Sequence, residues 1–154
     1  IGLMKVIADR VLEGGGEVIG VMPGKLADRE ILHGKLTDTI IVKDMQERKR
    51  IMDELSDGFI TMPGGFGTMD ELFEMLSCNQ LGLIHKPVGI YNIDGFYDPL
   101  IAWLDHSVDM KFIRPEHRAN ILVSDDASDL IDSMMDYEGL VAEEWVDRLK
   151  EKGY

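Results

Sequence analysis

The sequence predicts a three-layer α/β fold built on a mostly parallel sheet. Short apolar runs that are rich in β-branched residues alternate along the chain with segments of helical periodicity. The predicted strands are apolar on both faces, which is typical of a parallel sheet covered by helices on each side. The chain has 154 residues, of which 45% are hydrophobic, and no shift in composition marks a boundary. We therefore expect a single Rossmann-like domain over residues 1–154.

The first element is predicted to be a helix. Leu3, Val6, Ile7 and Val11 recur at helical spacing, and a run of three glycines ends the pattern. Five strands are expected after it, at residues 17–22, 39–42, 59–62, 88–93 and 121–123. Further helical patterns lie at residues 44–55, 68–81, 99–110, 128–135 and 143–152. The longest irregular stretch spans residues 23–36, and loops of that length often carry function.

The order of these elements predicts that a strand lies upstream of the chain. In a Rossmann-like fold the first strand and its phosphate turn precede the first helix, whereas this sequence opens on the helix. The first residue is Ile1 rather than a methionine. The expectation is therefore a domain that is shortened at its N-terminus and lacks its first strand.

Composition and charge limit the classes of partner. A net charge of −13 at pH 7 argues against nonspecific binding to nucleic acid or to an anionic membrane surface. The single cysteine, Cys78, suits a reducing compartment, and no run approaches the roughly 20 apolar residues that span a bilayer. Because the first residues also carry charges unlike those of a signal peptide, a cytoplasmic protein is expected. The four histidines form no ligand pair with Cys78 at metal-site spacing, which argues against a metal site.

A glycine-rich turn between a predicted strand and a predicted helix is the strongest functional signal. Gly64, Gly65 and Gly67 carry no Cβ, so their amide groups can approach an anion closely. The helix that is expected to begin near Thr68 adds unpaired amides and the positive end of its dipole. The spacing fits neither the dinucleotide fingerprint nor the Walker pattern. The turn therefore predicts a phosphate site of another class.

Two segments together carry a resemblance to a known family. The turn reads Pro-Gly-Gly-Phe-Gly-Thr-Met-Asp-Glu at residues 63–71, and Met-Gln-Glu-Arg-Lys precedes it at residues 45–49. This pair resembles the LONELY GUY (LOG) family, whose signature is P-G-G-x-G-T-x-x-E after an M-x-E-R-K segment. The similarity continues at residues 2–4, 17–23, 80–82 and 86–89 and at Glu30 and His33, so it covers most of residues 1–104. Gln46 departs from the family, where His is common, and Cys78-Asn79 replaces a common Trp-Ala pair.

The resemblance implies a specific reaction. Members of the family are cytokinin riboside 5′-monophosphate phosphoribohydrolases, often labelled lysine decarboxylases, and they release the base from a nucleoside 5′-monophosphate without a cofactor. It implies that Arg48 and Glu71 are catalytic, and that the substrate is bound by a larger set, namely Glu30, Met45, Lys49, Gly64, Gly65, Gly67 and Thr68. It also implies a homodimer. The expected substrate is a cytokinin ribotide or AMP.

Simpler interpretations exist for the same residues. Thr68-Met69-Asp70-Glu71 has the pattern of a capping box, in which Glu71 would bond the amide of Thr68. The basic run at residues 48–50 could be a solvated helix face after a capping-type Asp44. We favour function for Arg48 and Lys49 and a solvent-exposed position for Arg50. A nucleotide-binding module without hydrolysis remains the alternative to an enzyme.

Overall fold

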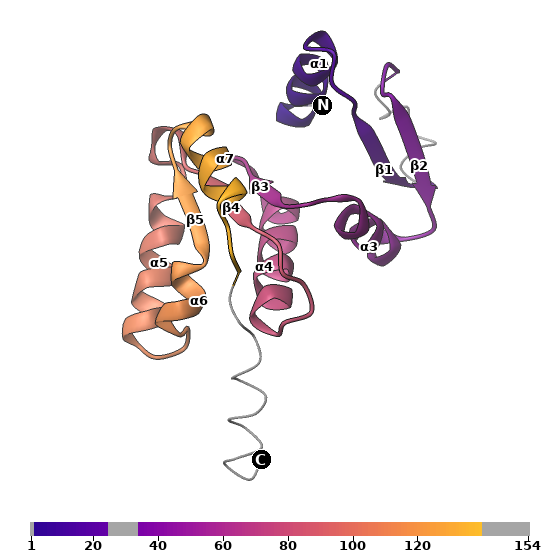
Figure 1. Ribbon diagram of the computed structural model, residues 1–154. Helices are drawn as coiled ribbons and strands as arrows, with labels where there is room; N and C mark the ends of the chain where they lie inside the picture. Colours follow the sequence, from indigo (N-terminus) through magenta and orange to yellow (C-terminus); the bar gives the residue numbers. More distant parts are fainter. Residues whose placement is uncertain (1, 25–33, 140–154) are drawn as a thin grey trace. The chain divides into compact units, whose positions relative to one another are not determined.

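The computed structural model of the chain describes residues 2–24 and 34–139 (Figure 1). The chain divides into two compact units, Ile1–Ser56 and Asp57–Tyr154. The predicted helix at residues 143–152 and most of the irregular stretch at 23–36 lie outside the described residues. In the described part of the chain, every helix is too short or too polar to cross a membrane.

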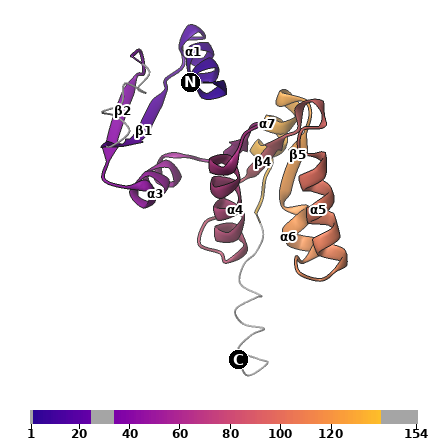
Figure 2. The same ribbon diagram turned by 180° about the vertical axis from the view of Figure 1, so that it is seen from behind.

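The first unit contains a two-stranded parallel sheet. Its strands pair in register from Ile19 with Asp38 to Pro23 with Val42. The elements, which can be followed in Figure 2, are helix α1 (Leu3–Glu13), strand β1 (Ile19–Pro23), strand β2 (Asp38–Val42) and helix α3 (Met45–Leu55). Helix α3 packs against both strands. All four elements therefore lie where the sequence predicted them, within a few residues at each end.

Helix α3 begins at a side-chain cap that the sequence predicted. The Asp44 carboxylate accepts a hydrogen bond from the amide of Glu47 at 2.8 Å. The Glu47 carboxylate in turn accepts a bond from the amide of Lys43 at 2.8 Å. Two amides at the start of the helix are thus satisfied by side chains, as in a capping box.

The second unit contains a three-stranded parallel sheet in the order β3-β4-β5. Its strands are β3 (Phe59–Thr61), β4 (Val88–Tyr91) and β5 (Ile121–Ser124). Its helices are α4 (Phe66–Gln80), the short 3₁₀ helix η1 (Ile93–Gly95), α5 (Asp98–Asp109), α6 (Pro115–Ala119) and α7 (Ala127–Met135). Pairing runs from Phe59 with Val88 and from Val88 with Ile121.

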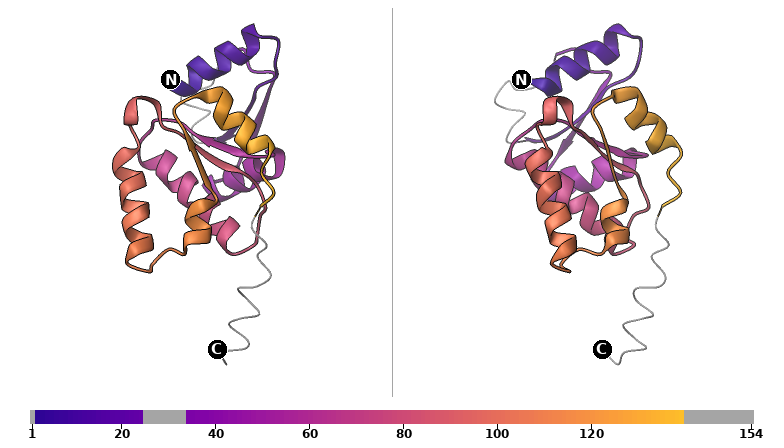
Figure 3. Two further views of the ribbon diagram at one scale, coloured as in Figure 1. Left: turned by 60° about the vertical axis from the view of Figure 1, so that its left-hand side comes forward. Right: turned by 90° about the vertical axis from the view of Figure 1, so that its left-hand side faces the viewer.

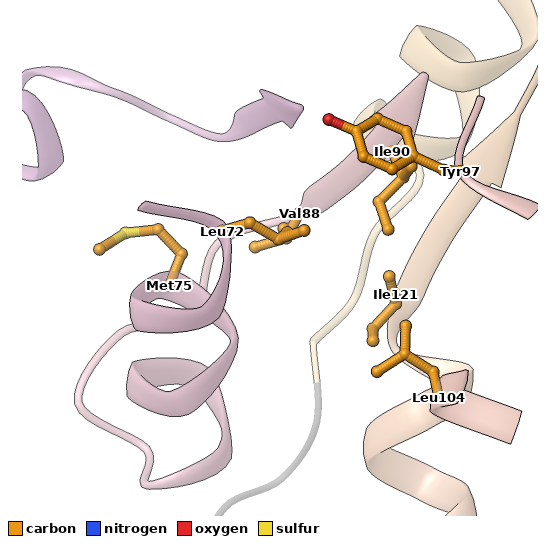
Figure 4. Close-up of a cluster of buried hydrophobic side chains, with 7 residues drawn as sticks. All are labelled: Leu72, Met75, Val88, Ile90, Tyr97, Leu104 and Ile121. Atoms are coloured by element: carbon orange, nitrogen blue, oxygen red, sulfur yellow. The ribbon is translucent and has the colours of Figure 1, made fainter. Parts of the chain in front are cut away.

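Central strand β4 has helices on both of its faces. Val88 and Ile90 point to one face, where they join a buried cluster with Leu72 of α4 and Leu104 of α5 (Figure 4). Gly89 points to the other face, where a Cβ would lie 3.0 Å from atoms of α7. Figure 3 shows α5 and α7 on opposite sides of β5. The second unit is thus a three-layer arrangement, which confirms the predicted α/β class with parallel strands.

Three elements differ from the sequence prediction. Strand β4 ends at Tyr91, and the chain turns into η1 instead of continuing to Ile93. Helix α4 begins at Phe66, two residues before the predicted start. Helix α6 was not predicted, although Pro115 is favoured as a first helical residue and was a usable signal.

Candidate active site

The glycine turn joins the carboxyl end of β3 to the start of α4, at the edge of the sheet where α/β proteins bind ligands. Gly65 is the N-cap residue of α4 and supplies no side-chain cap. The first amides of the helix therefore depend on partners other than an N-cap side chain. Such amides, together with the helix dipole, favour an anion at this end.

The capping-box interpretation of Thr68 and Glu71 is wrong. Because α4 begins at Phe66, Thr68 is its third residue and not its N-cap. Glu71 follows in the second helical turn, where its side chain is half-buried. The sequence did not show where the helix begins, because Gly64 and Gly65, directly before Phe66, have no side chain that could mark a cap.

Gly64 and Thr68 are packed directly against each other. A Cβ on Gly64 would lie 2.8 Å from Thr68 Cβ and would overlap its hydroxyl oxygen. The absence of a side chain at Gly64 therefore allows the Thr68 side chain to lie over the turn.

Gly65 and Gly67 differ from Gly64, because no neighbouring side chain occupies the space beside them. A Cβ built on either one would have no described atom within 4 Å, and neither has a positive φ. Neither crowding nor backbone strain among the described residues requires a glycine at these two positions. Both are exposed, so the space beside them is open to a ligand.

Tyr97 contacts the same turn and was not predicted from the sequence. It is 3% exposed, and its hydroxyl donates a hydrogen bond to the carbonyl of Met62 at 2.6 Å. Burial raises the pKa of Tyr97, and the nearby backbone of Gly64 partly offsets that rise. Only its position, shortly after a predicted strand end, could have drawn attention to it.

Arg48 is anchored within the first unit. Its Nε donates to the carbonyl of Val21 in β1 at 3.2 Å, and its side chain is half-buried. Lys49 is also half-buried, and Met45, the first residue of α3, is 45% exposed. Arg50 is exposed and forms an ion pair with Glu54. The expected contrast between Arg48 and the solvent-facing Arg50 is therefore present.

The predicted site residues fall into three groups. Those of the glycine turn and α4 are together in the second unit: Gly64, Gly65, Gly67, Thr68 and Glu71. Those of α3 are together in the first unit: Met45, Arg48 and Lys49. Glu30 lies outside the described residues. The roles of all nine residues remain predictions.

A second set of catalytic residue types does not form a site. Asp105, His106 and Ser107 are consecutive in α5. Asp105 pairs with Arg118 at 2.7 Å, and the Ser107 hydroxyl donates to the carbonyl of Trp103 at 2.8 Å. Ser107 is buried, so its hydroxyl is not available to a ligand in solution.

Comparisons with known proteins place the chain in a family. Residues 4–134 match the family model described as "Possible lysine decarboxylase". The chain is 45% identical over 137 residues to the rice (Oryza sativa subsp. japonica) protein named "Probable cytokinin riboside 5'-monophosphate phosphoribohydrolase LOGL1", covering 89% of this chain and 61% of the relative. It is 41% identical over 138 residues to the Arabidopsis thaliana cytokinin riboside 5'-monophosphate phosphoribohydrolase LOG5, covering 90% of this chain and 60% of the relative. The chain thus spans less than two thirds of the length of these relatives. The family model matches most of this chain, and the named relatives are at least 40% identical to it, so the chain belongs to the LOG family.

Proposed function

We propose that this protein hydrolyses the N-glycosidic bond of a nucleoside 5′-monophosphate, either a cytokinin ribotide or AMP. Water adds to C1′ of the ribose, the bond to the base breaks, and the base leaves with the bonding electron pair and takes up a proton. The products are the free base and ribose 5-phosphate. The observation that carries the proposal is the exposed glycine turn at the start of α4, in a chain similar to relatives named for this activity.

The proposed phosphate site is the glycine turn. Gly65 and Gly67 leave room for the phosphate oxygens beside the first amides of α4. Thr68, packed over Gly64, offers a hydroxyl donor at the same turn. A local site of this kind lets a phosphate bind to a protein whose net charge is −13.

Two charged residues are proposed to act on the sugar and the base. Cleavage of an N-glycosidic bond develops positive charge on the ribose, and a fixed carboxylate stabilises that charge. Glu71 is proposed for this role and for orienting the attacking water. Arg48 carries a positively charged guanidinium with several hydrogen-bond donors, so it is proposed to bind the substrate and stabilise charge on the departing base. Its Nε bond to Val21 supports a defined orientation of the guanidinium.

Incubation with AMP or with isopentenyladenosine monophosphate tests the proposal directly. Free adenine or free isopentenyladenine, separated by chromatography, is the expected product. The alternative function is a nucleotide-binding module that retains the turn but performs no hydrolysis. Binding of either nucleotide without release of base would support that alternative and contradict the enzyme.

The variant Glu71→Gln tests the catalytic role of the carboxylate. It removes the charge and keeps the shape of the side chain, so base release is expected to fall by at least about 100-fold. Thermal unfolding is expected to change little, because the glutamine amide keeps the size of the side chain and much of its hydrogen-bonding capacity. Asp70→Asn, a loss of the same charge at the exposed neighbouring position, is the matched control. Full turnover in Glu71→Gln would contradict the assignment.

The description of the family as "Possible lysine decarboxylase" raises a further function, that of a pyridoxal-phosphate-dependent decarboxylase. Such an enzyme requires a lysine that forms a Schiff base with the cofactor. Release of carbon dioxide from lysine by protein supplied with pyridoxal phosphate would support it. The similarity to named phosphoribohydrolases favours hydrolysis of a nucleotide instead.

We further propose that the protein is a cytoplasmic homodimer and that residues 1–154 form a single domain. The dimer is what the resemblance to the LOG family implies, and the single cysteine is consistent with a reducing compartment. The mass measured by light scattering tests the dimer. One cooperative unfolding transition, with equal calorimetric and van't Hoff enthalpies, tests the single domain.

A further inference from the structure

We propose that Tyr97 is a positioning residue for the phosphate turn, because its buried hydroxyl holds the carbonyl of Met62 at the entry to the turn. The inference rests on the proposed function only in assigning the turn to phosphate binding. The hydroxyl donates to Met62 O at 2.6 Å, and the backbone of Gly64 lies near the same oxygen. Met62 and Gly64 flank Pro63, so the buried oxygen lies where the chain enters the turn.

The hydroxyl is itself held in place by the core. The Tyr97 ring lies beside Ile90 in the buried cluster, and its oxygen points toward the end of β3 (Figure 4). The ring of Phe96 makes an edge contact with the Tyr97 ring at a centroid distance of 4.9 Å. Because burial raises its pKa, the hydroxyl remains protonated at neutral pH and continues to donate to Met62.

The backbone of Tyr97 is fixed through the neighbouring strands. Its amide donates to Asn92 Oδ1 at 2.7 Å, and the Asn92 amide donates to the carbonyl of Ser124 at 2.8 Å. Asn92 follows β4 and Ser124 ends β5, so the tyrosine is linked to the carboxyl ends of both strands. The same Asn92 side chain donates to Asp98 Oδ1 at 2.8 Å.

The turn before Tyr97 has the backbone that this arrangement requires. Asp94 and Gly95 have φ values of 51° and 68°. A Cβ on Gly95 would lie 2.6 Å from Asp98 Oδ2, so the carboxylate that receives the Asn92 bond occupies that space. The network thus runs from β5 through Asn92 and Tyr97 to the glycine turn, entirely within the second unit.

The hydrogen bond from Tyr97 to Met62 matters because the backbone angles of glycines are otherwise weakly restricted. Pro63 has a fixed φ, whereas Gly64 and Gly65 can adopt many backbone angles. With the Met62 carbonyl bonded to the buried hydroxyl, the turn that follows is held in one direction before a ligand arrives. Without the hydroxyl, a phosphate would have to order the turn as it binds, which weakens binding.

The variant Tyr97→Phe removes only the hydroxyl and keeps the ring in the core. We expect faster hydrogen exchange at the Gly64 amide and a rise of about two- to tenfold in KM for AMP, the range that a typical hydrogen bond contributes. The value of kcat is expected to change less, because the groups proposed to act on the glycosidic bond are untouched.

Tyr137→Phe is the matched control. The Tyr137 hydroxyl accepts a bond from Asn120 Nδ2 at 2.7 Å, and Asn120 precedes β5, at the opposite end of the strand from Ser124. This variant should lose a similar amount of stability while leaving both the Gly64 exchange rate and KM unchanged. A merely structural role for Tyr97 predicts equal effects in the two variants.

Two results would overturn the inference. One is unchanged exchange of the Gly64 amide in Tyr97→Phe, and the other is a KM that rises equally in Tyr97→Phe and Tyr137→Phe. If the wild-type protein releases no base from either AMP or isopentenyladenosine monophosphate, the proposed function fails. In that case the exchange rate of Gly64, which requires no turnover, still decides whether Tyr97 holds the turn.

Discussion

Gly67 is the residue at which function and stability separate most clearly. It lies in the first turn of α4, where glycine costs up to about 1 kcal/mol relative to alanine. A Cβ there would meet no described atom within 4 Å. We therefore predict that Gly67→Ala raises stability by up to about 1 kcal/mol, measured by urea unfolding. Base release from AMP should fall, because the methyl group occupies the space proposed for the phosphate.

Gly64→Ala is the variant with which Gly67→Ala should be compared. Here a Cβ would lie 2.8 Å from Thr68 Cβ, so the variant should lose about 1–3 kcal/mol through overpacking as well as losing activity. Equal behaviour of the two variants, or full activity in Gly67→Ala, would show that the glycines serve the packing of the fold and do not form a ligand site.

Two capping patterns show what the sequence could and could not predict about individual residues. Asp44 and Thr68 are each followed three residues later by glutamate. Asp44 is a cap because the helix begins directly after it. Thr68 is not, because the backbone already becomes helical at Phe66 without any side chain to mark the start. Tyr97 was missed because its role depends on a contact 35 residues away in sequence.

At the scale of the element, helix α3 carries both Arg48 and Lys49 and depends on the Asp44 cap. Asp44→Ala should cost about 1 kcal/mol, the usual loss for a cap of this type. Because the cap fixes the turn that precedes Arg48, base release should also fall. Urea unfolding and AMP turnover at a temperature where the variant is folded measure the two effects.

Helix α7 provides the control for that prediction. Its cap, Asp126, accepts bonds from the amides of Ser128 and Asp129 at 2.8 and 3.0 Å. Asp126→Ala should lose similar stability, but α7 carries none of the proposed site residues, so turnover should be retained. Equal losses of turnover in Asp126→Ala and Asp44→Ala would mean that only global stability was measured.

The elements themselves were largely predictable because their patterns are local. Each predicted strand in the described chain is present, and the helix predicted at residues 68–81 is present as α4. Close packing between elements was not predictable. Gly89 looks like a weak point in a strand, yet a Cβ there would lie 3.0 Å from Leu130 Cδ1 and Met134 Sδ of α7. Periodicity cannot reveal which glycine receives a neighbouring helix.

For the whole molecule, the decisive question is whether Arg48 and Glu71 act on one substrate. The first belongs to the unit Ile1–Ser56 and the second to the unit Asp57–Tyr154. Residues that stabilise one transition state as a unit show strongly non-additive losses when both are removed. We therefore predict that Arg48→Ala combined with Glu71→Gln loses much less activity than the product of the two single losses.

Arg50→Ala combined with Glu71→Gln is the matched control. Arg50 lies two residues from Arg48 in the same helix, but it is exposed and paired with Glu54. Its single effect on base release should be small, and the combination should be additive. The measurement is kcat/KM for AMP in each variant. If Arg48→Ala and Glu71→Gln also combine additively, the two residues do not act as a unit and the shared catalytic role proposed for them is wrong.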